Sequence, residues 1–228
     1  MSRLARVVAV LGPAAAGKTS LTRLIGQRQG YDAFRLREHV RESSEATISD
    51  PMRPGWFDDY TALSSVHAYL EEMVRQGIVH TVLMDNFPGT STQVGLFMSL
   101  VRQLAPTASV AAVELVAEDR VLWSRASARR VCQSCEQDPA DDPHLPAVAR
   151  YGESALCARC GQQLTQRVDD SFDAHLDRLR RYHNLADGVR STFTLTGIRI
   201  AQLNGGDTLQ AVERQFMFLL NSQESDRP

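Results

Sequence analysis

The chain contains 228 residues, 43% hydrophobic and 23% charged, so it is long enough for one large domain and too apolar to be wholly disordered. Its formal net charge of -2 lacks the strong basic excess of proteins that bind duplex nucleic acid. No stretch is apolar over a sufficient length to span a membrane, and we expect a cytoplasmic monomer that binds neither membranes nor nucleic acid.

The first predicted elements are a strand, a loop and a helix. The valine-rich run 6–11 is typical of a parallel strand that is buried on both faces. A loop with a glycine at each end follows at 12–17, and apolar residues on one side predict a helix over 18–26. This order of elements is the context in which a phosphate-binding loop is expected.

Strands and helices continue to alternate along the rest of the chain. Helices are predicted over 36–44, 59–76, 93–104, 118–128, 170–192 and 209–220. Strands are predicted over 81–84, 110–116 and 194–202, and the tail 223–228 is expected to be frayed. The alternation predicts an α/β fold, a P-loop three-layer sandwich with a mainly parallel central sheet. Segments 31–60 and 129–168 are predicted to be insertions into this one domain.

Gly12 to Thr19 match the phosphate-loop pattern G-x-x-x-x-G-K-[ST]. Backbone N–H groups of such a loop turn inward onto phosphate oxygens, and the following helix presents its N-terminus to the same anion. Lys18 then reaches the β- and γ-phosphates, and the Thr19 hydroxyl can hold Mg²⁺. The predicted nucleotide-binding residues are Gly12, Ala14, Ala15, Ala16, Gly17, Lys18, Thr19 and Ser20. A chance alanine-rich turn is the alternative, and the flanking strand and helix argue against it.

Asp85 follows the apolar strand predicted over 81–84. Ligands bind at the carboxyl ends of the strands in a parallel sheet, so a carboxylate there can hold Mg²⁺ directly or through water. An aspartate that merely caps a turn is the alternative. The preceding phosphate loop favours the metal-binding interpretation.

The four cysteines form two C-x-x-C pairs, Cys132 with Cys135 and Cys157 with Cys160, separated by 21 residues. This spacing is typical of a structural zinc site with four thiolates and no open coordination position. Metal binding would supply folding free energy to a segment too polar to fold alone. Two disulfides are the alternative, and His144, which lies between the pairs, is not included among the predicted ligands.

Arginines flank the cysteine segment. Arg125, Arg129 and Arg130 precede it, Arg167 follows it, and Arg178 lies on the next predicted helix. Phosphoryl transfer spreads charge over the transferred oxygens, and guanidinium groups in a water-excluded site stabilise that charge. Arginines beside a movable flap could be delivered by its closure. For any single arginine, a solvated charged surface is the alternative.

Taken together, these motifs resemble the adenylate kinase family of nucleoside monophosphate kinases, in the same order over nearly the whole chain. The phosphate loop resembles that of the family, and residues 85–90 with Gln93 resemble its D-G-F-P-R-T-x-x-Q signature. Residues 125–130 resemble its R-x-x-G-R-R lid entry, and residues 167–170 its R-x-D-D motif. The cysteines resemble the zinc-stapled lid of many bacterial members, and Arg178 and Tyr182-His183 also match.

The resemblance implies an enzyme that reversibly transfers the γ-phosphoryl group of Mg-ATP to AMP or a related nucleoside monophosphate. It implies ATP, Mg²⁺ and a structural Zn²⁺ as cofactors and small-molecule nucleotides as partners. The group being transferred would be stabilised by Lys18, Arg129, Arg167 and Arg178. Arg125 would contact the ATP base, and Asp85 would bind Mg²⁺ through water. Asp169 and Asp170 would orient the lid arginines.

On the acceptor side, the resemblance implies that Arg41 holds the acceptor phosphate and that Gln93 reads the acceptor base. Several positions depart from the family pattern: Gly89 replaces the signature arginine, Asn86 and Ala15 replace glycines, and Leu36 or Arg35 replaces a threonine. Losing a guanidinium from a phosphate site costs roughly 1.5–3 kcal/mol if nothing replaces it. Arg35, Arg37 and Arg53 are the candidates for that replacement.

Two further functions compete with this one. A zinc-containing deoxynucleoside kinase of the thymidine type also combines an N-terminal phosphate loop with C-x-x-C pairs. It needs a carboxylate base, and the stretch after Asp85 lacks the expected acidic partner. A catalytically degenerate regulatory protein that binds ATP is the third candidate, motivated by the altered acceptor side.

Overall fold

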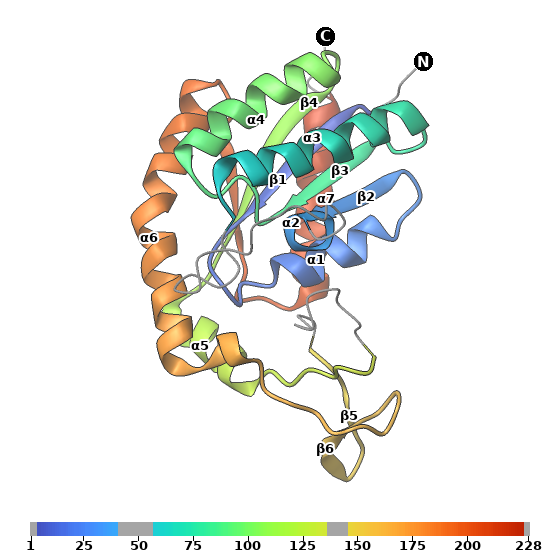
Figure 1. Cartoon of the computed structure of the whole chain (residues 1–228), viewed down its shortest axis with the longest axis vertical. Coiled ribbons are helices and arrows are strands. Elements are labelled where there is room, and N and C mark those ends of the chain that lie inside the picture. The colour runs from blue at the N-terminus through green and yellow to red at the C-terminus, as the bar shows by residue number, and fades with distance from the viewer. Residues whose placement is uncertain (1–3, 41–56, 136–145, 226–228) are drawn as a thin grey trace.

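The computed structural model describes residues 4–40, 57–135 and 146–225. Within these residues, five strands form the central sheet in the order β2-β3-β1-β4-β7, and every adjacent pair is parallel. They are β1 (Arg6–Leu11), β2 (Tyr31–Arg35), β3 (Thr81–Asp85), β4 (Ser109–Val116) and β7 (Ile200–Asn204). The predicted α/β fold with a mainly parallel sheet is therefore confirmed (Figure 1).

Helices cover both faces of this sheet. Helices α3 (Asp59–Gln76) and α4 (Ser91–Leu104) pack on one face, and α1 (Lys18–Gly26) and α7 (Leu209–Ser225) pack on the other (Figure 1). Successive β1 side chains join opposite cores, since side chains alternate along a strand. The long helix α6 (Phe172–Leu195) contributes Phe193 to the first core and Leu179 to the second. All six β1 residues are buried, as the valine-rich run predicted.

Side-chain caps set where several helices begin. Asp58 accepts a hydrogen bond from Thr61 N at 2.9 Å and starts α3. Thr90 accepts one from Gln93 N at 3.1 Å, so α4 begins at Ser91, two positions before the predicted start. These caps place the N-termini of α3 and α4 beside the loop that follows β3 (Figure 1).

Three predictions of secondary structure were wrong or incomplete. The strand predicted over 194–202 lies at Ile200–Asn204, because α6 continues to Leu195 before Gly197 adopts a φ of 83°. Strand β2 was not predicted, because its five residues show no regular strand alternation and lie within a segment of mixed charge. The tail was expected to be frayed from 223 onward, yet α7 extends to Ser225, and 226–228 lie outside the described residues.

Helices α2 and α5 and the 3-10 turn η1 lie within or next to the predicted insertions. Helix α2 (Leu36–Val40) forms the first part of the helix predicted over 36–44, whereas 41–56 and 136–145 lie outside the described residues. Arg41 and Arg53 fall in the first of these ranges and His144 in the second. Helix α5 (Asp119–Ala128) precedes the cysteines, and a 3-10 turn η1 (Val168–Asp170) precedes α6.

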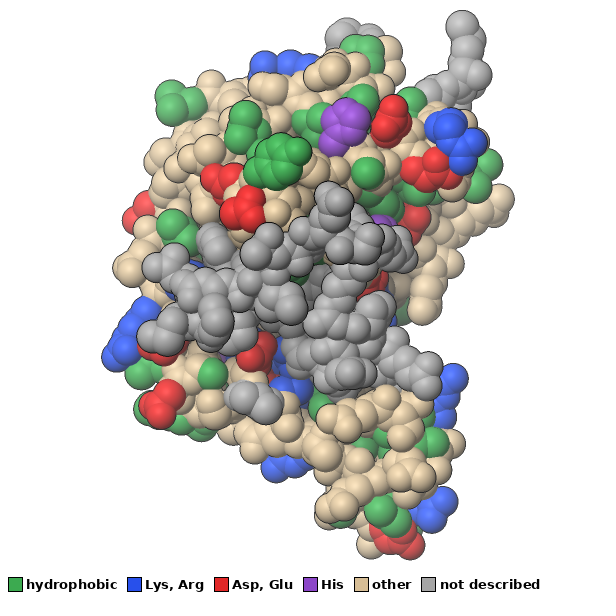
Figure 2. Space-filling view, viewed as in Figure 1, with side chains coloured by type: hydrophobic (Ala, Val, Ile, Leu, Met, Phe, Trp, Pro, Cys, Tyr) green, Lys and Arg blue, Asp and Glu red, His purple; other side chains and the backbone are tan. Residues whose placement is uncertain are grey.

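The cysteine segment contains an antiparallel pair of strands, β5 (Ala149–Arg150) and β6 (Glu153–Cys157). This hairpin projects from the lower end of the molecule in Figure 1, away from the central sheet. On the face shown in Figure 2, acidic and basic side chains are interspersed, and the described residues show no continuous basic patch there.

Candidate active site

A cavity of about 350 Å³ lies at the carboxyl ends of the central strands. Leu11, Arg35, Asp85 and Glu114, which lie at or near the ends of β1 to β4, contribute to its wall. The phosphate loop, the loop after β3, η1 and α6 complete it. This edge of a parallel sheet is where ligands bind in α/β proteins.

The phosphate loop folds tightly back onto the start of α1. Lys18 Nζ donates hydrogen bonds of 2.7 Å to Gly12 O and Pro13 O, so the side chain closes the loop. Gly12 has a φ of 135°, and a Cβ there would lie 2.3 Å from Leu115 O. A side chain at position 12 would therefore collide with the backbone of β4, which accounts for the glycine.

Ala15 occupies a conformation that disfavours alanine. Its φ is 65°, in the left-handed region, at the position where the family pattern has glycine. We expect Ala15→Gly to stabilise the protein by about 0.5–1 kcal/mol, because relief of the left-handed strain exceeds the entropy that glycine gains when unfolded. Urea denaturation measures this change. Ala14→Gly is the control, and equal effects of the two substitutions would contradict the prediction.

Lys18 is the only lysine in the chain, and its side chain is almost fully buried. Burial lowers the pKa of Lys18 from 10.5 to about 8; Asp85 opposes this shift, and the charges of Arg178 and Arg129 reinforce it. Burial thus makes the charge of the ammonium group costly. The phosphates of a bound nucleotide would supply opposite charge.

The lowered pKa of Lys18 makes stability depend on pH. Between pH 8 and 10.5 the unfolded chain keeps the Lys18 proton while the folded chain releases it, so stability rises with pH across this window. We expect the free energy of unfolding of the wild type to gain up to about 3 kcal/mol relative to Lys18→Met between pH 7.5 and 10. Parallel denaturation curves of both proteins measure the difference, and parallel pH profiles would contradict it.

Asp85 is buried at the end of β3, next to the phosphate loop. Burial raises the pKa of Asp85, against the charge of Lys18, a hydrogen bond from Thr19 and the charge of Arg35. Its Oδ1 is buried and has no hydrogen-bond partner among the described residues. A buried carboxylate oxygen that faces a phosphate loop beside a threonine hydroxyl has the donor chemistry that Mg²⁺ prefers. These residues therefore fit the metal that the sequence predicted.

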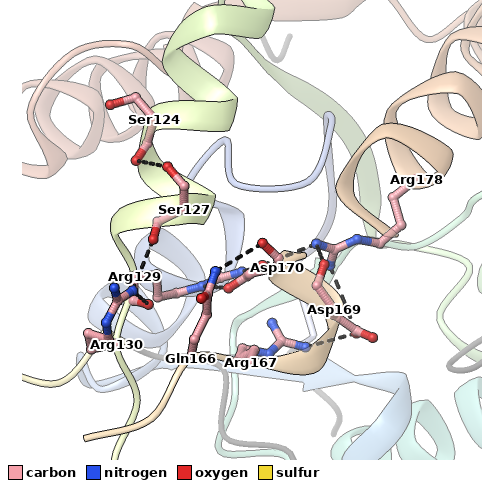
Figure 3. A network of polar contacts seen from close by, with 9 residues as sticks. All are labelled: Ser124, Ser127, Arg129, Arg130, Gln166, Arg167, Asp169, Asp170 and Arg178. Atoms are coloured by element: carbon pink, nitrogen blue, oxygen red, sulfur yellow. Dashed lines mark hydrogen bonds and ion pairs between the residues drawn. The ribbon is translucent and has the colours of Figure 1, made fainter. Parts of the chain in front are cut away.

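The predicted arginine set converges on the same cavity. Arg129 from the end of α5, Arg167 from the segment before η1, and Arg178 from α6 all line it. Figure 3 shows how two aspartates of η1 hold these three side chains together. Arg167 Nη2 lies 3.1 Å from Asp169 Oδ2, and Arg178 Nη2 donates to Asp169 O. Carboxylate and carbonyl oxygens of η1 thus orient arginines that come from separate segments.

Asp170 is the centre of this network. Its carboxylate is fully buried and accepts hydrogen bonds from Arg129 Nε at 2.6 Å, from Arg129 Nη2, and from Arg178 Nη2 at 3.1 Å (Figure 3). Burial by itself would raise the pKa of Asp170, but the hydrogen bonds from Arg129 and the nearby guanidinium charges outweigh it and lower the pKa. Gln166 Nε2 also donates to Asp170 O at 3.2 Å.

Two predicted residues are engaged elsewhere. Arg125 donates to the carbonyl oxygens of residues 205, 206 and 207 in the loop between β7 and α7. Gln93 is buried, accepts a hydrogen bond from Gly89 N at 2.8 Å and donates one to Asp59 Oδ1 at 2.8 Å. Neither lines the cavity in this structure. Gln93 connects the Gly89 loop to the start of α3, and this connection could not be inferred from its motif position.

Three other arginines lie in or near the same cavity. Arg35 lines the cavity. Arg130 turns back to Ser127 O and Arg129 O, at 2.9 Å each, and does not line it. Arg181 lines the cavity but was not singled out by its position in the sequence.

Asn86, which replaces a family glycine, has a φ of 58°, a conformation that asparagine tolerates better than most residues.

The sequence reasoning missed a buried polar network on the cavity wall. Glu114 Oε1 accepts a hydrogen bond from Tyr182 OH at 2.7 Å, and Glu114 Oε2 accepts one from Gln202 Nε2 at 2.9 Å. Arg190 donates to both oxygens at 3.0 Å. The network joins α6 to β4 and β7. A glutamate inside an otherwise apolar strand was the available signal.

The four cysteines come together beside the hairpin. Their sulfur atoms all lie within 4.8 Å of one another, and all four thiols are free. Cys132 Sγ lies 3.4 Å from Cys160 Sγ, and Cys135 Sγ lies 3.7 Å from Cys157 Sγ. Tetrahedral zinc with Zn–S bonds of about 2.3 Å separates its sulfurs by about 3.8 Å. The cluster therefore has the donor set and the dimensions of a four-thiolate site.

A parallel sheet of this strand order, with a phosphate loop after its central strand and basic residues around the strand ends, defines a P-loop kinase fold. Among the described residues, no helix has the length and apolar character needed to cross a membrane.

Comparison with known proteins identifies the relatives of this chain. It is 28% identical to an adenylate kinase of Treponema pallidum (strain Nichols) over 213 residues, which cover 90% of this chain and 94% of the relative. It is 26% identical to an adenylate kinase of Rhizobium rhizogenes, over 76% of this chain and 80% of that relative. It is 24% identical to an adenylate kinase of Methanothrix thermoacetophila, over 90% of this chain and 94% of that relative. No protein-family model matches the chain. The resemblance to adenylate kinases that the motifs predicted is therefore confirmed over most of the sequence.

Proposed function

We propose that this protein is an adenylate-kinase-like nucleoside monophosphate kinase. It reversibly transfers the γ-phosphoryl group of ATP to AMP or a related nucleoside monophosphate. The similarity to adenylate kinases along most of the chain supports this activity. The observation that carries the proposal is the convergence of Lys18, Arg129, Arg167 and Arg178 on one cavity with Asp85.

The proposed mechanism relies on positioning and electrostatic stabilisation. An oxygen of the acceptor phosphate forms a bond to the γ-phosphorus while the bond to the β–γ bridging oxygen breaks. Lys18 and the three arginines compensate the charge on the transferred oxygens, and no residue forms a covalent intermediate. Asp85 and Thr19 would hold Mg²⁺, which when bound neutralises charge on the β- and γ-phosphates.

The remaining roles are also part of the proposal. Asp169 and Asp170 orient the arginines, and the cysteine-containing segment 129–168 acts as a lid that excludes water from the donor phosphates. Arg125 contacts the ATP base only if it exchanges its bonds to the carbonyl oxygens of the β7–α7 loop. Segment 31–60 receives the acceptor, where Arg41 binds its phosphate. Gln93 reads the acceptor base only if it exchanges its bonds to Gly89 and Asp59.

An acceptor screen tests this function. Purified protein is incubated with Mg-ATP and each nucleoside monophosphate or nucleoside separately, and products are separated by ion-exchange chromatography. We expect ADP to form only when a monophosphate is added, together with the matching diphosphate. Phosphorylation of a nucleoside would instead indicate the thymidine type of kinase. Tight ATP binding without any turnover would indicate a regulatory protein and refute the proposal.

We further propose that the four thiols bind one structural Zn²⁺. Cys132 and Cys157 are buried against Leu164, so the metal would hold the hairpin together where few apolar residues exist to do so. We expect one zinc per chain by elemental analysis, and loss of metal with a lower melting temperature in Cys132→Ser. Ser134→Ala in the same turn is the control. A metal-free protein with two disulfides would contradict the prediction.

A further inference from the structure

Arg35 and Asp85 lie side by side at the ends of adjacent strands. The register of β2 and β3 pairs the two residues directly. Arg35 Nε lies 3.7 Å from Asp85 Oδ2, and the two side chains are 14% and 5% exposed. A buried guanidinium therefore adjoins the carboxylate that, by its position, is the expected metal ligand.

The contact between these two residues is incomplete. At 3.7 Å the two charged atoms attract each other but are too far apart for a hydrogen bond. Arg35 Nε and Asp85 Oδ1 are both buried without hydrogen-bond partners among the described residues. Burying such atoms without partners costs free energy, so both side chains retain capacity for another ligand.

The other end of the Arg35 guanidinium is held by Glu38. Arg35 Nη1 donates to Glu38 Oε1, so the guanidinium lies between two carboxylates on the cavity wall. Gly89, where the family pattern has an arginine, lines the same cavity. Arg35 thus has anionic partners in this structure, and a phosphate in the cavity would be another.

We propose that Arg35 is an internal cation at Asp85 that competes with a divalent metal ion, and that metal binding releases Arg35 to a phosphate group in the same cavity. The first part rests only on the positions of Arg35 and Asp85 relative to each other. The second part rests on the proposed function, because the phosphate would be that of the acceptor. Metal and acceptor would then each strengthen the binding of the other, as linkage requires.

Metal binding tests the first part without any turnover. Mn²⁺ is titrated into protein saturated with the non-hydrolysable β,γ-imido analogue of ATP, and free Mn²⁺ is measured by electron paramagnetic resonance. We expect Arg35→Gln to tighten Mn²⁺ binding about tenfold, since a competing buried cation is gone. Arg35→Lys keeps the charge and should leave the affinity within about twofold of wild type.

Arg23→Gln is the matched control. Arg23 Nη2 also lies 3.8 Å from Glu38 Oε1, but Arg23 does not line the cavity. Tightening in Arg35→Gln alone supports the proposal. Equal tightening in both variants would mean a general charge effect, and unchanged or weaker Mn²⁺ binding in Arg35→Gln would mean that Arg35 is only a structural partner. Either result overturns the proposal, once circular dichroism confirms that the variants are folded.

The second part is tested by AMP binding to the same complex. In the wild type, saturating Mn²⁺ should tighten AMP binding about fivefold or more, and Arg35→Gln should abolish this dependence on metal. If AMP binding is insensitive to Mn²⁺ in the wild type, the proposal that metal binding releases Arg35 to the acceptor is wrong. Because neither titration requires catalysis, a failed acceptor screen and a failed competition between Arg35 and metal remain distinguishable.

Discussion

We expect Lys18→Met to lower kcat for phosphoryl transfer by roughly 10²–10³-fold, because it removes a preorganised cation from the site where charge develops. Lys18 is buried, contacts the phosphate loop through two carbonyl oxygens and lies beside the cavity that the arginines line. Methionine keeps most of the volume of the side chain. Initial rates at saturating ATP and acceptor measure the effect.

The control for this substitution is Arg28→Met. Arg28 follows α1, is 46% exposed and pairs with Glu213, away from the cavity. Its loss should change kcat less than about twofold, since exposed ion pairs contribute little. If Lys18→Met keeps wild-type kcat while Arg28→Met behaves as expected, Lys18 does not stabilise the transferred group. A Lys18→Met protein that binds a non-hydrolysable ATP analogue separates a lost catalytic group from a lost nucleotide.

Asp170→Asn should destabilise the protein by roughly 3–5 kcal/mol and also lower kcat, because it removes the charge of a fully buried carboxylate that holds Arg129 and Arg178. Asp170 binds both Arg129 and Arg178 (Figure 3). Both arginines line the cavity. The free energy of unfolding is measured by urea denaturation. Steady-state kinetics under native conditions measures kcat and so tests whether the arginines still stabilise the transferred group.

Asp177→Asn, on the helix α6 that follows η1, is the matched control. Asp177 pairs with Arg180 at 3.4 Å, but the two side chains are 68% and 66% exposed. Its substitution should cost less than about 1 kcal/mol and leave kcat unchanged. Similar small losses in the two variants would show that Asp170 does not organise the arginines. A loss of stability without any loss of kcat would restrict Asp170 to a structural role.

The sequence alone was sufficient for features whose residues are neighbours in the chain. Residues 12–19 form the predicted phosphate loop, since strand, glycines and helix follow one another directly. The cysteine cluster was also predictable, because each C-x-x-C pair forms a local turn and only one association of the two pairs was needed. Asp85 was placed at the end of its strand by the apolar run before it.

Only the tertiary structure decided which polar side chains meet and which are already engaged. Gln93 matches a motif, but its amide bonds to Gly89 and to Asp59, which lies far from it in sequence. Glu114 acquires its partners from α6 and β7, and Arg35 reaches Asp85 through the register of two strands. Such contacts depend on how the elements pack, and the free energy of a polar side chain depends on its burial and partners. A linear pattern specifies neither of these.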